Sequence, residues 1–229
     1  MAPARHLVLV PGAGSDPVYW EALQTELTVR GQVSTAVDLP CEDADLLLAD
    51  YAEVVAGVVR TLGDVPVTLV AHSFGAFTAG LVPDLVPVDH LVLVGPMIPA
   101  PGESGSQWWA ATGQHAAHEA AARAAGLTPP LDLEELFYNG CSPEQRAVAA
   151  TWNRDQADAP FVQPWPRAAW PDVPTEVVAF AEDLVLPPEL VTRIARERLD
   201  LPVRLAPGGH MGMVSHPAEL AELLLGGKR

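Results

Sequence analysis

The chain is poor in cysteine, and this shortage excludes two classes of protein. Its 229 residues contain only two cysteines, Cys41 and Cys141, and neither has a recognisable motif around it. Small secreted domains that depend on disulfides use more, so we interpret both thiols as free. No CxxC pair and no Cys/His cluster indicates zinc. We therefore expect neither a disulfide scaffold nor a metal site.

Basic residues are also scarce. The sequence has 13 Lys and Arg against 29 Asp and Glu, which gives a formal net charge of −16. A chain with this balance repels the phosphates of nucleic acids and of anionic membranes, so we expect neither as a partner. We interpret the excess of acidic residues as a contribution to solubility.

Long apolar runs are missing as well. The first run, Leu7 to Val10, is too short for a signal peptide, and no segment approaches the roughly 18 apolar residues that suggest a membrane span. Hydrophobic residues nevertheless make up 49% of the chain and charged residues 18%, which argues against disorder and for a substantial core. These features favour a cytoplasmic, soluble protein with a single domain over residues 1–229.

Short apolar runs alternate with segments of helical periodicity through much of the chain. This alternation predicts an α/β fold with a mostly parallel, doubly wound sheet of about six strands and helices on both faces. The expected strands are 7–10, 33–37, 67–70, 91–94, 176–181 and 203–205. The expected helices are 17–30, 46–62, a segment from about 74 to 81, 188–199 and 217–225.

The alternation breaks over residues 96–171. No strand is expected there, whereas helical stretches are expected near 105–125, 132–138 and 143–153. Most of the tryptophans lie in this region: Trp108, Trp109, Trp152, Trp165 and Trp170. We interpret the region as a helical cap inserted over one edge of the sheet rather than as a second domain.

One segment carries most of the functional information. A short aliphatic run from Val67 to Val70 is followed by Ala71, Ser73 and Gly75 and then by an alanine-rich, helix-compatible stretch. This pattern resembles the nucleophile elbow of α/β-hydrolases, Gly-x-Ser-x-Gly, with Ala71 in place of the first glycine. Small residues on either side of the serine let the strand and the helix pass closely, and the amides at the helix start can stabilise an oxyanion. An ordinary strand-to-helix turn with a surface serine is the alternative.

A nucleophilic serine needs a base and an orienting acid. Of the seven histidines, His210 has the best context, because it follows the last strand in a glycine-containing loop. His72, next to the serine, should point away, and we interpret it as structural. Two neighbouring carboxylates, Glu182 and Asp183, follow the fifth expected strand. Only one of them can face the imidazole, and a solvated acidic turn is the alternative for both.

The whole chain resembles the small α/β-hydrolases that include plant methylesterases, hydroxynitrile lyases and their bacterial relatives. The strongest parts of the resemblance are residues 70–75, 170–174, 182–187 and 208–217. It implies an α/β-hydrolase fold and the catalytic residues Ser73, Asp183 and His210. Asp183 is preferred over Glu182 because the family favours aspartate before a hydrophobic run and proline.

The resemblance also implies an oxyanion hole. The turn Pro11-Gly12-Ala13-Gly14 matches the family's His-Gly-x segment, so the amides of Ala13 and Phe74 would hold the oxyanion. Pro11 stands where relatives usually have histidine, which predicts a slightly different loop geometry. A phosphate-binding loop is disfavoured, because Pro17 breaks the GxGxxG pattern.

Two departures bear on the reaction. Met211 stands where the lyases carry lysine, and Gly12 stands where they carry threonine, so the resemblance implies an esterase rather than a cyanohydrin lyase. The expected function is hydrolysis of a small, largely apolar carboxylic ester, thioester or lactone through an acyl-enzyme, with no cofactor. The alternatives are a lyase, a cyclase or a cofactor-free oxygenase that uses His210 and Asp183 as a base, or a ligand-binding protein without turnover. The expected substrate contacts are Gly12, Trp108, Trp109, Leu131, Phe137, Phe161, Trp165 and Met211.

Overall fold

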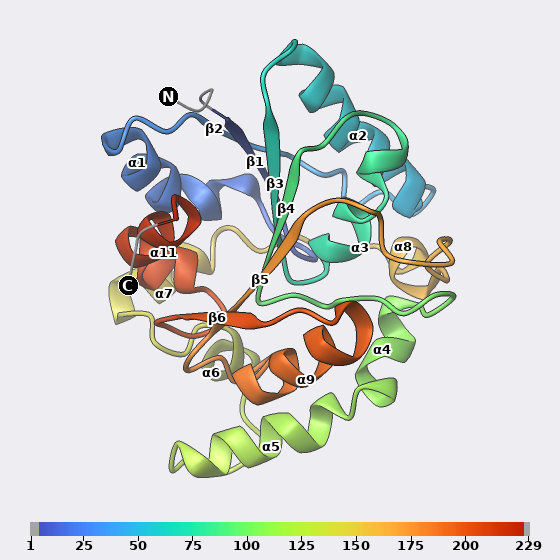
Figure 1. The fold of residues 1–229 in the computed structure, drawn as a ribbon. Coiled ribbons are helices and arrows are strands. Elements are labelled where there is room, and N and C mark those ends of the chain that lie inside the picture. The colour runs from blue at the N-terminus through green and yellow to red at the C-terminus, as the bar shows by residue number, and fades with distance from the viewer. Residues whose placement is uncertain (1–4, 227–229) are drawn as a thin grey trace.

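The computed structural model describes residues 5–226. Within them, six strands form one sheet in the order β2-β1-β3-β4-β5-β6, and every neighbouring pair is parallel (Figure 1). The strands are β1 (His6–Val10), β2 (Ser34–Ala36), β3 (Val67–His72), β4 (His90–Val94), β5 (Thr175–Phe180) and β6 (Val203–Ala206). The predicted parallel α/β sheet is therefore confirmed, with strand ends shifted by one or two residues.

Side chains alternate between two buried faces along each central strand. On β1, Leu7 and Leu9 join one hydrophobic core, while Val8 and Val10 join the other. Both sets are almost fully buried. A parallel sheet covered on both faces needs apolar residues at every position of its strands, which explains the continuous apolar runs of the sequence.

Helices cover both faces. One face carries α1 (Glu21–Val29), α10 (Gly212–Ser215) and α11 (Pro217–Leu224), and the opposite face carries α2 (Leu48–Thr61), α3 (Gly75–Ala79) and α9 (Pro188–Leu199). Figure 1 places α1 beside α11. Short 3₁₀ turns at η1 (Pro17–Trp20) and η2 (Val82–Asp84) begin or extend two of the expected helices. The helix α10 was not predicted, because four residues are too few to display a helical period.

Between β4 and β5 the chain forms a separate group of helices. They are α4 (Gly105–Ala111), α5 (Gln114–Ala124), α6 (Leu133–Phe137), α7 (Pro143–Ala149) and α8 (Asp158–Val162). The single helix expected over 105–125 is in fact two, divided at Gly113, whose φ of +67° is left-handed. Helix α8 was not predicted. Residues 96–171, here called the inserted region, contain no strand of the sheet, and only an isolated bridge joins Asn153 to Ser15.

The order of the strands creates a crevice at one point of the sheet edge. From β1 the chain passes to β2 on one side and then returns to β3 on the other side. The loops that follow β1 and β3 therefore leave the carboxyl edge side by side and diverge. In open α/β sheets this switch point is where ligands bind.

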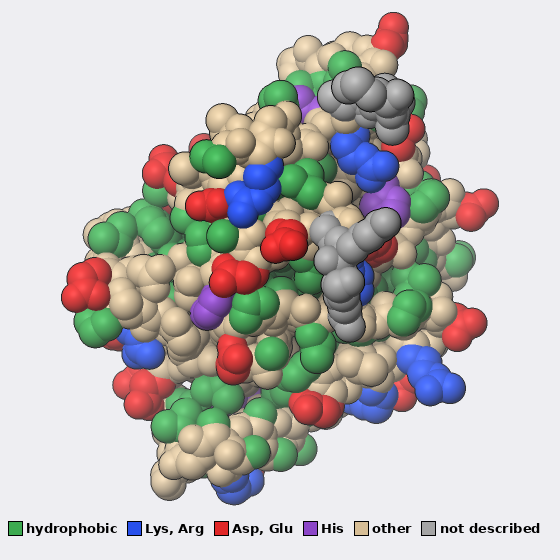
Figure 2. All heavy atoms as spheres, turned by 60° about the vertical axis from the view of Figure 1, so that its left-hand side comes forward, with side chains coloured by type: hydrophobic (Ala, Val, Ile, Leu, Met, Phe, Trp, Pro, Cys, Tyr) green, Lys and Arg blue, Asp and Glu red, His purple; other side chains and the backbone are tan. Residues whose placement is uncertain are grey.

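The surface carries the acidic side chains that give the sequence its negative net charge (Figure 2). Acidic side chains are spread over the face drawn in Figure 2, among basic and hydrophobic ones, and do not gather in one patch. None of the helices within residues 5–226 combines the length and the apolar character needed to cross a membrane.

Candidate active site

Ser73 lies at the apex of a tight turn between β3 and α3. Its backbone φ of +53° is left-handed, which is uncommon for a residue with a side chain and is typical of a nucleophile elbow. Two residues later, a Cβ atom on Gly75 would collide with the carbonyl oxygen of Pro11. Only glycine therefore allows α3 to start so close to the end of β1. Ala71, two residues before the serine, is completely buried.

Three side chains meet at this turn. The Nε2 atom of His210 lies 3.2 Å from the hydroxyl oxygen of Ser73, and its Nδ1 atom lies 2.8 Å from Oδ2 of Asp183. Asp183 follows β5 and His210 follows β6, so adjacent strands deliver them to the same edge. The side chains of His210 and Asp183 are 2% and 0% exposed. These contacts match the geometry that a nucleophile, a base and an orienting acid require.

The neighbouring carboxylate has a different role. Glu182 accepts a hydrogen bond from the amide of Gly208 at 2.5 Å and does not reach the imidazole. Its carbonyl oxygen accepts a hydrogen bond from Asn139 of the inserted region. Glu182 thus holds the loop that carries His210, while the next residue, Asp183, faces the ring.

The loop after β5 fixes the acid. The second carboxylate oxygen of Asp183 accepts hydrogen bonds from the amides of Val185 and Leu186, both at 2.8 Å. Helix α5 holds the same loop: Nδ1 of His118 donates to the carbonyl of Leu184, and Gln114 donates to that of Val185. These two contacts cannot be predicted from the sequence, because neither residue lies in a motif.

The two amides expected to form the oxyanion hole are free. Among the described residues, neither the amide of Ala13 nor that of Phe74 has a hydrogen-bond partner. Both residues line the cavity that also contains Ser73 and His210. Unpaired backbone donors beside a serine hydroxyl are the groups that can bind a developing oxyanion.

His72 is one of the residues that line this cavity, and its ring connects two parts of the site. Its Nε2 atom donates to the carbonyl oxygen of His210 at 3.1 Å. Its Nδ1 atom lies 3.3 Å from the hydroxyl of Tyr19, which in turn accepts a hydrogen bond from the amide of Gly12 at 3.2 Å. Burial, reinforced by the nearby His210, holds the pKa of His72 well below its ordinary value. Burial likewise raises the pKa of Tyr19 well above its ordinary value, so the phenol keeps its proton.

A cavity of about 670 Å³ opens over Ser73. Five of the expected contacts line it, namely Gly12, Trp109, Phe137, Phe161 and Met211. Leu131 lies instead in a smaller cavity next to it, which shares Trp109, Phe137 and Val185 as walls. Further lining residues that were not anticipated are Tyr19, Met97, Leu133, Glu134, Tyr138, Arg146, Ala150, Asn153, Arg154, Gln156 and Val185.

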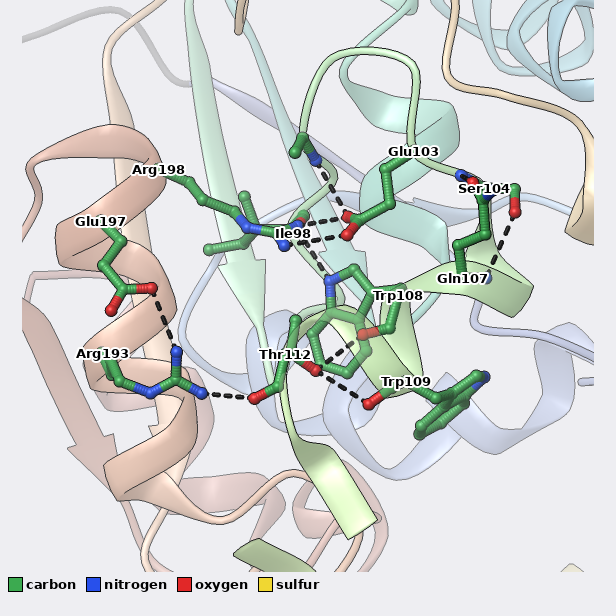
Figure 3. Close-up of polar contacts among 11 residues, drawn as sticks. Ile98, Glu103, Ser104, Gln107, Trp108, Trp109, Thr112, Arg193, Glu197 and Arg198 are labelled. Atoms are coloured by element: carbon green, nitrogen blue, oxygen red, sulfur yellow. Dashed lines mark hydrogen bonds and ion pairs between the residues drawn. The ribbon is translucent and has the colours of Figure 1, made fainter. Parts of the chain in front are cut away.

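Trp108 and Trp165 do not line the cavity, which corrects their expected role as substrate contacts. Trp108 is 0% exposed, and its indole donates to the carbonyl of Ile98 at 2.8 Å. The same carbonyl accepts from Arg198 of α9, which also pairs with Glu103 (Figure 3). Trp108 therefore anchors α4 to the segment that follows β4.

Trp165 is 1% exposed, donates to the carbonyl of Phe77 and stacks on Trp170. A Cβ atom on Gly80 would lie 2.9 Å from both indoles. Trp165 thus holds the end of the inserted region against α3. The number of aromatic residues in a region indicates how much packing the region provides, but it does not indicate which rings face the cavity.

Both cysteines are free and buried, and burial raises the pKa of each thiol. Over residues 5–226, no three His, Cys, Asp or Glu side chains come together in a way that could hold a metal ion.

Solved structures with the same fold cover almost the whole chain. An extracellular alpha/beta-hydrolase from Paenibacillus species, described as sharing structural and functional homology with Tobacco Salicylic Acid Binding Protein 2, aligns with a TM-score of 0.75 at 18% identity, covering 98% of this chain and 99% of that one. Polyneuridine aldehyde esterase aligns with a TM-score of 0.75 at 22% identity and covers 97% and 98%. A pyrethroid hydrolase from Sphingobium faniae JZ-2 aligns with a TM-score of 0.70 at 21% identity and covers 97% and 96%.

Comparison with curated protein sequences gives no match. A family model, in contrast, matches residues 7–223 and is described as the alpha/beta hydrolase family. The match extends from β1 to the last helix, and so it includes every strand of the sheet and the loops that carry Ser73, Asp183 and His210. The chain therefore belongs to the alpha/beta hydrolase family.

Proposed function

We propose that this protein is a serine hydrolase that cleaves a carboxylic ester through an acyl-enzyme. The observation that carries the proposal is the line of contacts from the Ser73 hydroxyl to Nε2 of His210, at 3.2 Å, and from Nδ1 to Asp183, at 2.8 Å. A neutral imidazole whose Nδ1–H donates to the carboxylate presents an unprotonated Nε2 to the serine.

In the proposed reaction, the Ser73 oxygen attacks the ester carbonyl while Nε2 of His210 takes the hydroxyl proton. The amides of Ala13 and Phe74 bind the oxyanion, and Asp183 stabilises the imidazolium. His210 then gives the proton to the leaving alcohol, which departs and leaves an acyl group on Ser73. Water activated by the same ring attacks the acyl group and releases the acid.

The cavity favours a largely apolar substrate. The inserted region would act as its cap and supply aromatic walls from Trp109, Phe137 and Phe161. The polar side chains Asn153 and Gln156 line the cavity too. We infer a small ester with an apolar or aromatic group, and a thioester or a lactone would fit the same chemistry. The names of the similar structures, an esterase and a pyrethroid hydrolase, support ester cleavage.

The first test is intact mass after exposure to a fluorophosphonate. We expect one adduct on the native protein and none on Ser73→Ala, because only an activated serine displaces the fluoride. An ester panel then identifies the preferred acyl and alcohol groups. A folded native protein that forms no adduct would contradict the proposal and favour a non-hydrolytic use of His210 and Asp183. Preference for highly charged esters would contradict the apolar substrate.

A further inference from the structure

A segment of the inserted region runs along the loop that follows β1. We call residues 152–156 the strap and residues 11–16 the β1 loop. The amide of Asp16 donates to the carbonyl of Trp152 at 3.0 Å, and the amide of Arg154 donates to the carbonyl of Gly14 at 2.8 Å. These bonds flank the isolated bridge between Ser15 and Asn153. The strap therefore holds the loop that carries one of the two free amides.

The side chain of Gln156 completes this attachment. Its Oε1 atom accepts a hydrogen bond from the amide of Gly14 at 3.1 Å. Its Nε2 atom donates to the carbonyl of Ala157 at 3.0 Å and to the hydroxyl of Tyr51 on α2 at 3.2 Å. Because the donor side of the amide is held by the hydroxyl of Tyr51 and the carbonyl of Ala157, the acceptor side stays directed at Gly14.

Gly14 is adapted to this contact. Its φ of +57° is left-handed, and a Cβ atom there would lie 2.6 Å from the carbonyl oxygen of Arg154. No other residue could keep both the backbone conformation and the close approach of the strap.

The amide of Ala13 lies between two amides that are held in place by hydrogen bonds. The amide of Gly12 is held by the hydroxyl of Tyr19, and that of Gly14 is held by Gln156. Within the described residues the amide of Ala13, which lies between them, is free. A peptide plane can rotate only if its neighbours adjust, so fixing the planes on both sides fixes the direction of the Ala13 N–H.

We propose that Gln156 is a positioning residue of the oxyanion hole: it holds the amide of Gly14 and thereby keeps the amide of Ala13 directed at the oxyanion. The proposal rests on the proposed serine hydrolase function. Gln156 also lines the cavity, so a direct contact with substrate is the competing role. A substrate contact acts on ground-state binding and varies with the ester, whereas a positioned oxyanion donor acts on the transition state of every ester.

The test compares Gln156→Leu with Gln163→Leu. Gln163 is a matched control, because its Oε1 also accepts a backbone amide from outside the inserted region, that of Leu48 at 2.9 Å, and neither residue lines the cavity. We expect Gln156→Leu to lower kcat by about 10- to 100-fold with KM nearly unchanged, less than the loss from deleting an oxyanion donor. Gln163→Leu should leave kcat unchanged. Gln156→Glu retains an acceptor for Gly14 and should recover part of kcat.

Inhibitors provide a second readout that a merely structural role would not move. A trifluoromethyl ketone matching the preferred ester adds to Ser73 and places an oxyanion in the hole, whereas the methyl ketone of the same shape reports ground-state binding. In Gln156→Leu the inhibition constant of the trifluoromethyl ketone should rise by the factor lost in kcat/KM, and that of the methyl ketone should not change.

The outcomes separate this proposal from the proposed function. If the native protein neither hydrolyses esters nor reacts with the fluorophosphonate, the function fails and the role of Gln156 fails with it. If the native protein is active and Gln156→Leu matches Gln163→Leu, only the role of Gln156 is overturned. A rise in KM that differs between esters, with kcat retained, would overturn it in favour of substrate contact. Should Gln156→Leu not fold, Gln156→Asn, which withdraws the acceptor by one methylene, is judged by the same criteria.

Discussion

The ring of His72 holds the main chain of His210: Nε2 of the first donates to the carbonyl oxygen of the second at 3.1 Å. A carbonyl oxygen can only accept, so the proton lies on Nε2, and Nδ1 accepts from the hydroxyl of Tyr19. The residue before the serine therefore links the β1 loop, through Tyr19, to the residue proposed as the base. This link explains why a histidine is buried beside the serine without taking part in the proposed chemistry.

The low pKa of His72 makes stability depend on pH. The ring stays neutral in the folded protein, but it takes up a proton in the unfolded chain below its ordinary pKa of about 6.5. Because the unfolded state then binds more protons, the free energy of unfolding falls as the pH falls below about 6.5. We expect this single group to contribute a slope of at most about 1.4 kcal/mol per pH unit.

Urea unfolding of the native protein and of His72→Gln between pH 5 and pH 8 measures this contribution. The groups that face the ring, Tyr19 and His210, are present in both proteins, so the difference between the curves isolates His72. The two curves should be parallel above pH 7 and converge as the pH falls. Curves that stay parallel down to pH 5 would mean that His72 takes up protons alike in the folded and in the unfolded protein.

Tyr19→Phe should weaken both stability and catalysis. Removing the hydroxyl leaves the amide of Gly12 and Nδ1 of His72 without their partner in a buried setting. An unsatisfied buried group costs about 1–3 kcal/mol, so the free energy of unfolding should fall by that amount. Because the β1 loop then loses a support, kcat on the preferred ester should fall by a larger factor than KM rises. Unchanged kcat would show that the Ala13 amide needs no support from this side.

Asp183→Asn should abolish most of the activity without unfolding the protein. The amides of Val185 and Leu186 require an acceptor at Oδ1, so the new carboxamide must place its NH₂ group toward Nδ1 of His210. That forces the imidazole proton onto Nε2, which can no longer accept from Ser73. We expect kcat to fall by about 10⁴-fold.

Glu182→Gln is the matched control for that substitution. The new side chain retains an oxygen that can accept from the amide of Gly208, so kcat should change far less than in Asp183→Asn. Equal losses in the two variants would mean that the loop conformation, and not the tautomer of His210, limits the rate.

Two adjacent tryptophans should respond in opposite ways to truncation. Trp108→Ala empties a fully buried site and removes the bond to Ile98, so the free energy of unfolding should fall by about 3–5 kcal/mol. Trp109 lines the cavity, so Trp109→Ala should enlarge it and shift the ester preference toward bulkier groups. Urea unfolding and an ester panel distinguish the two effects. A shifted preference in Trp108→Ala with unchanged stability would contradict the assignment.

The sequence predicted the sheet and the meeting of Ser73 with His210 because their signals are local. Buried parallel strands need apolar residues throughout, and the turn at Ser73 needs small residues at fixed distances. Asp183 could be separated from Glu182 by resemblance alone, because the direction of a side chain at a strand end depends on the following turn. The structure supplies that turn through the amides of Val185 and Leu186.

The contacts between the inserted region and the loops of the candidate site could not be predicted from the sequence. The strap binds the β1 loop largely through main-chain atoms, and these carry no mark in the sequence. Gln114, His118 and Gln156 are ordinary polar residues of helices and loops until the fold brings them to their partners. The burial of Trp108 and Trp165 likewise depends on which face of the region meets the sheet.

The inserted region touches two of the loops that carry the candidate site, those that follow β1 and β5. The strap holds the β1 loop, Asn139 holds the loop between β5 and the acid, and His118 holds the carbonyl of Leu184 just beyond it. An engineer who exchanges residues 96–171 for those of a relative to import its specificity would also remove these three supports. Grafts that keep positions 114, 118, 139 and 152–156 while replacing the cavity walls offer a route to new specificity with the catalytic geometry retained.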